Sequence, residues 1–324
     1  MKNKIPNHKL RSLFQNIKNL NLLVVGDLIL DKYIMGSVDR ISPEAPVPVV
    51  SVISRENRIG GAGNVAANLA GLGCDVSLAG VCGADENADI LEKLFEQHQI
   101  KHIPTTVTDR NTSVKSRIIA KHQQLVRIDD EKTAPVDEKV LDLLLENMNI
   151  LQNNYDGIIL SDYKKGLLTP NFISKIIAQA GSIPLIIDPK GHDYTRYEGA
   201  TAIKPNLNEF QIAVHHPELQ MDELEEYAIN MVRTLKLQGI VITLGEHGVF
   251  VLDDKQKCYL IPTDAKEVFD VSGAGDTFIA TFTAAFALSN DWHLAAKAGN
   301  LASGIAVGKV GTATVSLQEI LDIL

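Results

Sequence analysis

The chain has 324 residues, of which 45% are hydrophobic and 22% are charged. This balance is typical of a folded globular protein and excludes a disordered or fibrous chain. Its 31 Lys and Arg residues are outnumbered by 40 Asp and Glu residues, which gives a formal net charge of −9. A chain this acidic has no general electrostatic attraction for nucleic acid or for an anionic membrane, so neither is expected as a partner.

The cysteines and the apolar runs indicate the compartment. Cys74, Cys82 and Cys258 are too widely spaced for a C-x-x-C pair, which disfavours a disulfide framework or a thiolate zinc site. The apolar run at 22–30 is interrupted by Gly26 and Asp27, and no later run is long enough to span a bilayer. We therefore expect a cytoplasmic protein.

Short apolar runs alternate with helical stretches along most of the chain. The first runs predict a buried strand over 21–26, a small-residue helix over 64–72, a strand over 75–81 and a helix over about 86–98. Further buried strands are expected at 157–160, 185–187, 200–203 and 240–244. Strands that are apolar on both faces and separated by helices predict a mostly parallel sheet with helices on both sides, in the α/β class.

Two stretches break this alternation. Residues 33–55 carry three prolines beside β-branched residues, and residues 105–128 alternate apolar and polar side chains. Strands with one wet face fit a small, separate sheet. We interpret the two stretches as a β lid over one edge of the main sheet, within a single domain spanning 1–324. The periodicity is equally compatible with two surface hairpins that gate nothing.

The motif D-V-S-G-A-G-D-T-F at 270–278 precedes an apolar helix expected over about 276–288. Gly273 and Gly275 would let the backbone turn tightly and leave the first helical amides free, which favours an anion site. Asp276 at the same place is explained if it takes a proton from a hydroxyl while the amides stabilise a phosphoryl group in transfer. Alternatively, Asp276 caps the helix.

The motif K-P-N-L-N-E at 204–209 follows the expected strand 200–203. Ligands of open parallel sheets bind beyond the carboxyl ends of the strands. Asn206 and Glu209 could therefore face one ligand, and Glu209 could hold Mg²⁺ through water. A reciprocal helix cap between Asn206 and Glu209 is favoured unless other site residues converge here.

The motif G-G-A-G-N at 60–64 partly matches a dinucleotide fingerprint. That fingerprint requires a buried strand directly before it, whereas residues 55–58 read R-E-N-R. The dinucleotide interpretation, and with it an NAD-dependent oxidoreductase, is therefore disfavoured. The glycines instead fit a polyol lying against bare backbone, with Asn64 hydrogen-bonding a hydroxyl.

Taken together, the motifs at 60–64, 206–209 and 273–278 resemble, in order and spacing, the signatures of the ribokinase, or phosphofructokinase B, family of sugar kinases. The resemblance covers essentially the whole chain. Four stretches are similar, more narrowly, to the bacterial D-glycero-β-D-manno-heptose 7-phosphate kinases: 41–50, 188–191, 204–209 and 308–316. In many bacteria this kinase is fused to a C-terminal cytidylyltransferase. No such module follows in this sequence, so a stand-alone kinase or a kinase module is expected.

The resemblance implies a ribokinase-like three-layer sandwich with a small β lid. It also implies ATP-dependent phosphorylation of heptose 7-phosphate at the anomeric hydroxyl, giving the 1,7-bisphosphate for ADP-heptose and lipopolysaccharide core synthesis. Another sugar or nucleoside kinase of the same family is the alternative. A non-catalytic regulator on the same scaffold would be expected to lose the base, and the retention of Asp276 argues against it.

The resemblance also assigns site residues. It makes Asp276 the general base and the amides of Gly273, Ala274 and Gly275 an anion hole. The residues implied for ATP and its Mg²⁺ are Asn206, Leu207, Asn208, Glu209 (also the metal ligand), Thr243, Gly245 and Asn300. Those implied for the acceptor are Asp31, Gly60, Gly61, Asn64 and Lys190.

The sugar's 7-phosphate needs basic partners, and four side chains in the lid stretches are candidates. Arginine suits bidentate contact with phosphate. The candidates are Arg40, Lys115, Arg117 and Arg127, although a solvated lid face is the common alternative for such charges. Lid strands with an exposed edge also commonly pair between subunits, which predicts a homodimer through the lid.

Overall fold

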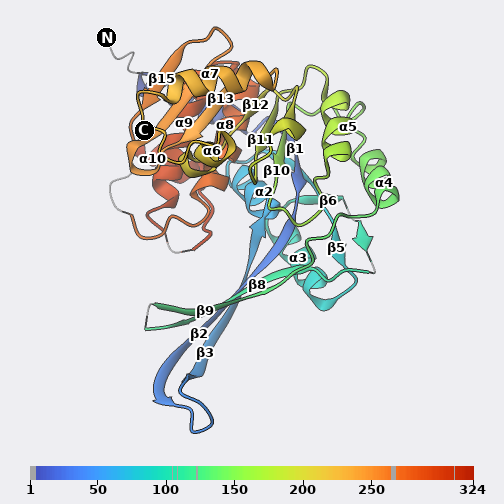
Figure 1. Ribbon diagram of the computed structural model, residues 1–324, viewed down its shortest axis with the longest axis vertical. Coiled ribbons are helices and arrows are strands. Elements are labelled where there is room, and N and C mark those ends of the chain that lie inside the picture. Colours follow the sequence, from blue (N-terminus) through green and yellow to red (C-terminus); the bar gives the residue numbers. More distant parts are fainter. Residues whose placement is uncertain (1–4, 104, 108, 122, 264–267, 310) are drawn as a thin grey trace.

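The computed structural model describes residues 5–103, 105–107, 109–121, 123–263, 268–309 and 311–324. Positions 108, 122 and 310, which fall within stretches considered above, lie outside the described residues. The chain forms an α/β body from which a long, narrow sheet projects (Figure 1).

Among the described residues, nine strands form the central sheet of the body. From one edge to the other they are β15 (Cys258–Ile261), β14 (Val249–Leu252), β13 (Gly239–Thr243), β12 (Ala202–Ile203), β11 (Leu185–Asp188), β10 (Gly157–Ser161), β1 (Asn21–Gly26), β4 (Asp75–Ala79) and β6 (Lys101–Ile103). Pairing is parallel from β13 to β6, whereas β14 pairs antiparallel with both of its neighbours, β13 and β15. Each predicted buried strand is present, with bounds that differ by a residue or two.

Helices cover both faces of this sheet. Side chains of β1 alternate between two cores, since Leu22 and Val24 belong to one and Leu23 and Val25 to the other. The first core is shared with α1 (Asn7–Ile17), α2 (Ala62–Gly71), α3 (Glu86–Gln97), α8 (Ala274–Ser289), α9 (Trp292–Ala306) and α10 (Leu317–Ile323). The second is shared with α4 (Glu138–Met148), α5 (Pro170–Ala180), α6 (Leu207–Ala213) and α7 (Leu224–Thr234). The predicted three-layer α/β fold is confirmed.

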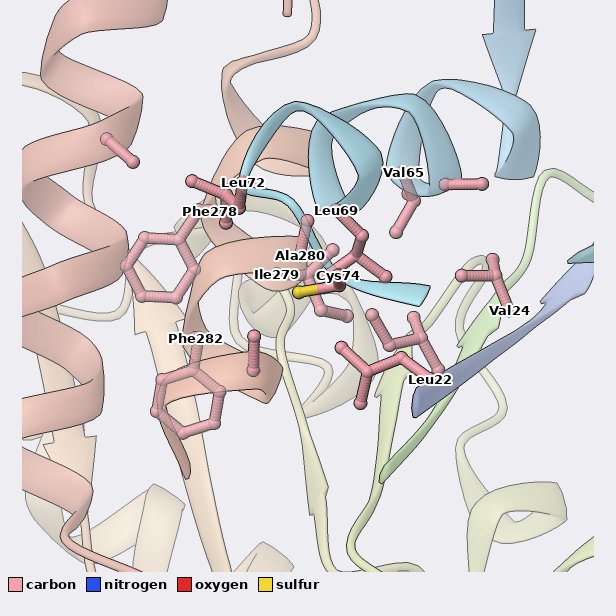
Figure 2. Packing of buried hydrophobic residues seen from close by; sticks show 14 of the residues in the cluster. Leu22, Val24, Val65, Leu69, Leu72, Cys74, Phe278, Ile279, Ala280 and Phe282 are labelled. Atoms are coloured by element: carbon pink, nitrogen blue, oxygen red, sulfur yellow. The ribbon is translucent and has the colours of Figure 1, made fainter. Parts of the chain in front are cut away.

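Helix α8 is buried on all sides over most of its length. Its residues from Asp276 to Phe286 are buried. Figure 2 shows Ile279 of α8 beside Leu69 of α2, and Phe282 of α8 beside Phe278. Burial of apolar side chains on this scale stabilises the fold by about 25 cal/mol per Å². The helix that carries the D-V-S-G-A-G-D motif is thus fixed rigidly in the centre of the body.

A second sheet contains β3 (Pro48–Gly61), β2 (Leu28–Ile41), β8 (Ser113–Ala120) and β9 (Gln123–Asp130), in that order. We call it the projecting sheet (Figure 1). Strand β2 pairs antiparallel with β3 and parallel with β8. The sheet leaves the body beside the carboxyl end of β1, because β2 begins at Leu28, directly after β1 ends at Gly26.

The bounds of this sheet differ from the stretches read from the sequence. Strand β2 starts at Leu28 rather than at Tyr33, and the start is hidden in the sequence because residues 28–30 are as buried as β1. Residues Thr106–Val107 form β7, which pairs with β5 (Cys82–Gly83) in a separate small sheet. The residues before β8 therefore belong to the body.

The motif at 60–64 lies at the junction between the projecting sheet and α2. Gly60 and Gly61 end β3, which pairs antiparallel with β2 rather than lying in the parallel sheet. A dinucleotide fingerprint requires a parallel strand before the glycines. The structure therefore agrees with rejecting the dinucleotide interpretation. Within the described residues, the structure contains no helix with the length and apolar character required to cross a membrane.

The packing of α8 predicts a large effect of truncating Phe282, which is fully buried and stacks on Phe278 and Phe286. Phe282→Ala should lower the free energy of unfolding by about 3–5 kcal/mol, measured by urea denaturation. Phe269→Ala is the control, because Phe269 is 68% exposed and its truncation should change stability by less than about 0.5 kcal/mol. Equal effects of the two substitutions would contradict the packing described here.

Candidate active site

A cavity of about 190 Å³ lies where the carboxyl ends of β10, β11 and β12 meet the N-terminus of α8. The segments that follow β10, β11 and β12 and the first turns of α6 and α8 contribute its walls. The lining residues are Asp162, Tyr163, Asp188, Pro189, Lys190, Lys204, Asn206, Glu209, Gly273, Gly275 and Asp276. Two motifs that the sequence singled out, at 204–209 and 270–278, thus converge on one cavity.

Asp276 is held in this cavity by two hydrogen bonds. One carboxylate oxygen accepts from Asn64 Nδ2 at 2.7 Å and the other from the Tyr163 hydroxyl at 2.8 Å. The capping explanation for Asp276 is wrong, because the N-cap residue of α8 is Gly273 and no side chain caps the helix. Burial raises the pKa of the Asp276 carboxyl, while the hydrogen bonds from Asn64 and Tyr163 and the charge of Lys204 lower it.

The two glycines of the motif, Gly273 and Gly275, differ in why the structure favours glycine at each position. Gly273 has a φ of 79°, a left-handed conformation that favours glycine, and a Cβ there would lie 3.0 Å from Asn64 Nδ2. A Cβ on Gly275 would lie 3.4 Å from Lys204 Nζ. Of the three amides expected in the anion hole, that of Ala274 already donates to the carbonyl of Val271 at 3.3 Å. The anion site therefore depends on Gly275, the helix dipole and Lys204 more than on Ala274.

Lys204 and Asp188 form a buried ion pair in the cavity wall. The lysine is 3% exposed and its Nζ lies 3.1 Å from the Asp188 carboxylate. Burial raises the pKa of Asp188 to about 7, although the charge of Lys204 lowers it. The pair holds a positive charge close to the first turn of α8.

Asn206 and Glu209 form the reciprocal cap that the sequence favoured. The Asn206 side chain accepts from the amide of Glu209, and the Glu209 carboxylate accepts from the amide of Asn206. The other Glu209 oxygen accepts from Lys190 Nζ at 2.6 Å. All three side chains line the cavity, while Leu207 and Asn208 lie in the first turn of α6. Asn206 and Glu209 therefore cap α6 and also line the cavity.

The expected acceptor residues lie at the base of the projecting sheet. Asp31 on β2 is buried and accepts from Arg117 Nη1 of β8 at 2.6 Å. A Cβ on Gly60 would lie 2.7 Å from Asp31 Oδ2, so the strand approaches this carboxylate closely. Gly61 has a φ of 57° and leads into α2, where Asn64 contacts Asp276. Asp31 and Asp276 are thereby placed on the same side of the body.

Several expected residues are not brought to the cavity. Arg40 is exposed and pairs with Val49 near the outer end of β2, roughly 30 Å along an extended strand from Asp31. Asn300 of α9 donates to the carbonyl of Pro262 at 2.8 Å and does not line the cavity. Thr243 is adjacent, since it forms a β-bridge with Asn206, and Gly245 follows it.

The remaining basic candidates of the projecting sheet are paired with acids. Lys115 and Arg127 both contact Asp129. Arg117 lies over the ring of Tyr33, 5.3 Å from its centroid, as well as against Asp31. Arg58, to which the sequence assigned no role, lies over the same ring at 4.7 Å from its centroid. Arg58, which also pairs with Glu56 at 2.7 Å, stands opposite Asp31 in the register of β2 and β3, and Arg117 contacts Asp31 directly.

Sequence reasoning also gave no role to Tyr163, Asp188 or Lys204. Asp188 ends the buried strand β11, and Tyr163 and Lys204 closely follow β10 and β12, so all three lie where ligands of parallel sheets bind. Applying that rule to every predicted strand, rather than only to 200–203, would have found all three. The contact between Tyr163 and Asp276 has no sequence signal, because 113 residues separate them.

A family profile described as "pfkB family carbohydrate kinase" matches residues 19–320. Curated relatives include the "Bifunctional protein HldE" of Methylobacillus flagellatus, 46% identical over 306 residues, and that of Pelobacter propionicus, 41% identical over 320 residues. The alignments cover 92% and 97% of this chain but 62% and 65% of the relatives. The chain therefore spans less than two thirds of the length of these relatives.

Solved structures share the fold at low identity. Phosphofructokinase-2 from Escherichia coli in complex with substrates and products superimposes with a TM-score of 0.78 at 18% identity, covering 94% of this chain and 98% of that chain. Arabidopsis thaliana ribokinase complexed with ribose and ATP gives a TM-score of 0.73 at 18% identity, covering the same shares.

The Lys204–Asp188 pair predicts a pH-dependent loss of stability in Lys204→Met. In the folded chain Asp188 keeps its proton up to about pH 7, whereas in the unfolded chain it ionises near pH 4, so stability falls between these values as pH rises. Without Lys204 to lower the folded pKa, the fall continues to higher pH. The variant should lose about 3 kcal/mol in urea denaturation at pH 8.5 and less at pH 6.

Lys236→Met is the matched control, because Lys236 pairs with Glu198 on the surface and is 74% exposed. It should change stability by less than about 0.5 kcal/mol at both pH values. A loss in Lys204→Met that does not depend on pH would contradict the assignment of the pair.

Proposed function

Because the chain belongs to the pfkB family of carbohydrate kinases, we propose that its cavity transfers the γ-phosphoryl group of ATP to a sugar hydroxyl. The observation that carries this proposal is the buried carboxylate of Asp276 in the first turn of α8. A carboxylate beside a helix N-terminus and a buried lysine combines a proton acceptor with an anion site. Phosphoryl transfer to an alcohol requires these two elements.

In the proposed reaction Asp276 accepts the hydroxyl proton as the sugar oxygen forms a bond to the γ-phosphorus. The bond from that phosphorus to the bridging oxygen of ATP breaks, and ADP leaves with the electron pair. The amide of Gly275, the dipole of α8 and the Lys204 ammonium stabilise the charge on the phosphoryl oxygens. Lys204 suits this role because its Nζ lies beside Gly275.

The nucleotide would lie on the side of the cavity formed by α6 and β13. Asn206, Glu209 and Lys190 line that wall, and Thr243 and Gly245 extend it. We propose that Lys190, which was expected on the acceptor side, instead contacts the ATP phosphates, because it pairs with Glu209 on this wall. The expected contact of Asn300 with the base is not supported, because Asn300 is occupied with the Pro262 carbonyl.

Mg²⁺ would enter with ATP, and the residues present fit an ion held largely by phosphate oxygens and water. Both Glu209 oxygens already accept hydrogen bonds, from Lys190 and from the amide of Asn206, so Glu209 would reach the ion through water. No group of three ligating side chains surrounds one point among the described residues. When bound, the metal would neutralise charge on the phosphates.

We propose heptose 7-phosphate as the acceptor, phosphorylated at its anomeric hydroxyl. Support comes from the four stretches that resemble heptose 7-phosphate kinases and from the 41–46% identity to HldE proteins. Asp31, Gly60 and Gly61 would contact the sugar hydroxyls. Arg117 and Arg58 are the better candidates for its 7-phosphate, because Arg40 lies too far along β2.

We also propose that the projecting sheet acts as the lid and as the contact surface of a homodimer. It exposes several large apolar side chains: Ile41, Val52, Ile53, Leu125, Val126 and Ile128, with Val47 in the segment that joins β2 to β3. Apolar surface of this kind is typical of protein interfaces. Closing over the cavity, the sheet would exclude water that otherwise hydrolyses ATP. Dependence on ATP favours a cytoplasmic reaction.

The purified chain with Mg-ATP should consume ATP only when heptose 7-phosphate is supplied. Asp276→Asn should keep ATP binding, measured by calorimetry, and lower turnover by ~10²-fold or more. Asp254→Asn is the control, because Asp254 lies in an exposed turn, and its turnover should be unchanged. Equal or greater turnover with ribose or fructose 6-phosphate would overturn the substrate, and full activity of Asp276→Asn would overturn the base.

The proposed dimer predicts the effect of a charge on the projecting sheet. Ile53→Asp should shift the chain from dimer to monomer in sedimentation velocity, because a buried unpaired carboxylate is costly in an apolar interface. Leu151→Asp is the control, since Leu151 is equally exposed, at 75%, but follows α4 on the body. A monomeric unsubstituted chain, or equal effects of the two substitutions, would refute the dimer through this sheet.

A further inference from the structure

We propose that Tyr163 is a positioning residue whose hydroxyl fixes the carboxylate of Asp276 against the cavity. This inference deepens the proposed function and rests on it. Tyr163 comes from the loop after β10 and lines the cavity together with Asp276. Its hydroxyl donates to Asp276 Oδ1 at 2.8 Å, while Asn64 holds Oδ2. With one donor on each oxygen, the plane of the carboxylate is defined before a substrate arrives.

The direction of the bond follows from the surroundings of the tyrosine. Burial, and then the nearby carboxylates Asp276 and Asp188, raise the pKa of Tyr163 well above its usual value. The phenol therefore keeps its proton at neutral pH and is the donor in the bond to Asp276. Asp276 is left with free lone pairs on both oxygens, which are available to a substrate hydroxyl.

The loop that carries Tyr163 is itself fixed by a buried carboxylate. Asp27, which follows β1 and is 3% exposed, accepts from the amides of Tyr163 at 2.9 Å, Lys165 at 3.0 Å and Leu167 at 3.3 Å. Three amides on one carboxylate leave the loop little freedom. Hydrogen bonds thus connect Asp27, at the end of β1, to the loop of Tyr163, and Tyr163 to Asp276.

The charges that face Asp276 come from three elements. Lys204 after β12 favours its ionised form, whereas Asp31 on β2 and Asp188 at the end of β11 oppose it. Tyr163 and Asn64 are uncharged, and their hydrogen bonds favour the carboxylate. Removing the Tyr163 hydroxyl therefore leaves the charges in place and raises the pKa of Asp276.

Tyr163→Phe keeps the ring and removes only this hydroxyl, so it separates positioning from packing. Because the base must be ionised, the acidic limb of the kcat–pH profile should move to higher pH by about one unit, so that kcat at a pH on this limb is about tenfold lower. The Kd for ATP should stay unchanged. A profile that superimposes on that of the unsubstituted chain would overturn the inference.

Tyr194→Phe is the matched control. Tyr194 is also buried, and its hydroxyl has no hydrogen-bond partner among the described residues. Removing that hydroxyl should leave the pH profile in place. A shift as large as that of Tyr163→Phe would show that the effect is a general consequence of losing a buried phenol.

A double-mutant cycle gives a readout that does not depend on activity. The unfolding equilibrium is measured for Tyr163→Phe, for Asp276→Ala, which removes the acceptor, and for both together. The hydrogen bond predicts a coupling of about tenfold in the unfolding constant, and additive effects would overturn it. If the unsubstituted chain consumes no ATP with any sugar, the proposed function fails while this coupling still decides whether Tyr163 holds Asp276.

Discussion

The site depends on one constraint, the burial of a carboxylate in the first turn of a helix that is itself buried on all sides. A buried Asp276 is costly unless its charge is offset, and Asn64, Tyr163 and Lys204 provide two hydrogen bonds and a positive charge. These three residues come from α2, the loop after β10 and the end of β12. The buried charge of Asp276 is therefore stabilised only after elements distant in the sequence have assembled, so the site forms only in the complete fold.

The projecting sheet links the acceptor side of the site to the rest of the molecule. Its two long strands begin and end within a few residues of the cavity, at Leu28 and Gly61, and the outer part extends away from the body (Figure 1). Asp31, Arg58 and Arg117 lie at its base, so movement of the sheet would move the proposed sugar contacts together. A lid of this form would couple closure of the cavity to the arrival of the acceptor.

Much of the fold could be predicted from the sequence because its buried strands are continuous apolar runs. The strands at Asn21–Gly26 and Gly157–Ser161 are examples, and the glycines around Asp276 marked the helix terminus. The start of β2 at Leu28 could not be predicted, since residues 28–30 continue the apolar run of β1.

The site was predicted only where a local pattern marked it. Asp276, Asn206 and Glu209 belong to short motifs, whereas the contact of Tyr163 with Asp276 depends on the tertiary fold alone. The structure does not place Arg40 near the site, because each residue along a strand adds about 3.3 Å and Arg40 is nine residues beyond Asp31 on β2. The sequence shows that the lid stretches contain basic side chains, but it does not show how far each lies from the proposed sugar site.

The central claim is that Asp276 takes the proton of the acceptor hydroxyl. A crystal structure with the sugar phosphate and a non-hydrolysable ATP analogue tests it most directly. The account predicts an acceptor hydroxyl about 2.6–3.2 Å from an Asp276 carboxylate oxygen, with the γ-phosphate at the N-terminus of α8. A sugar bound elsewhere, or an Asp276 side chain that contacts neither substrate, would contradict it.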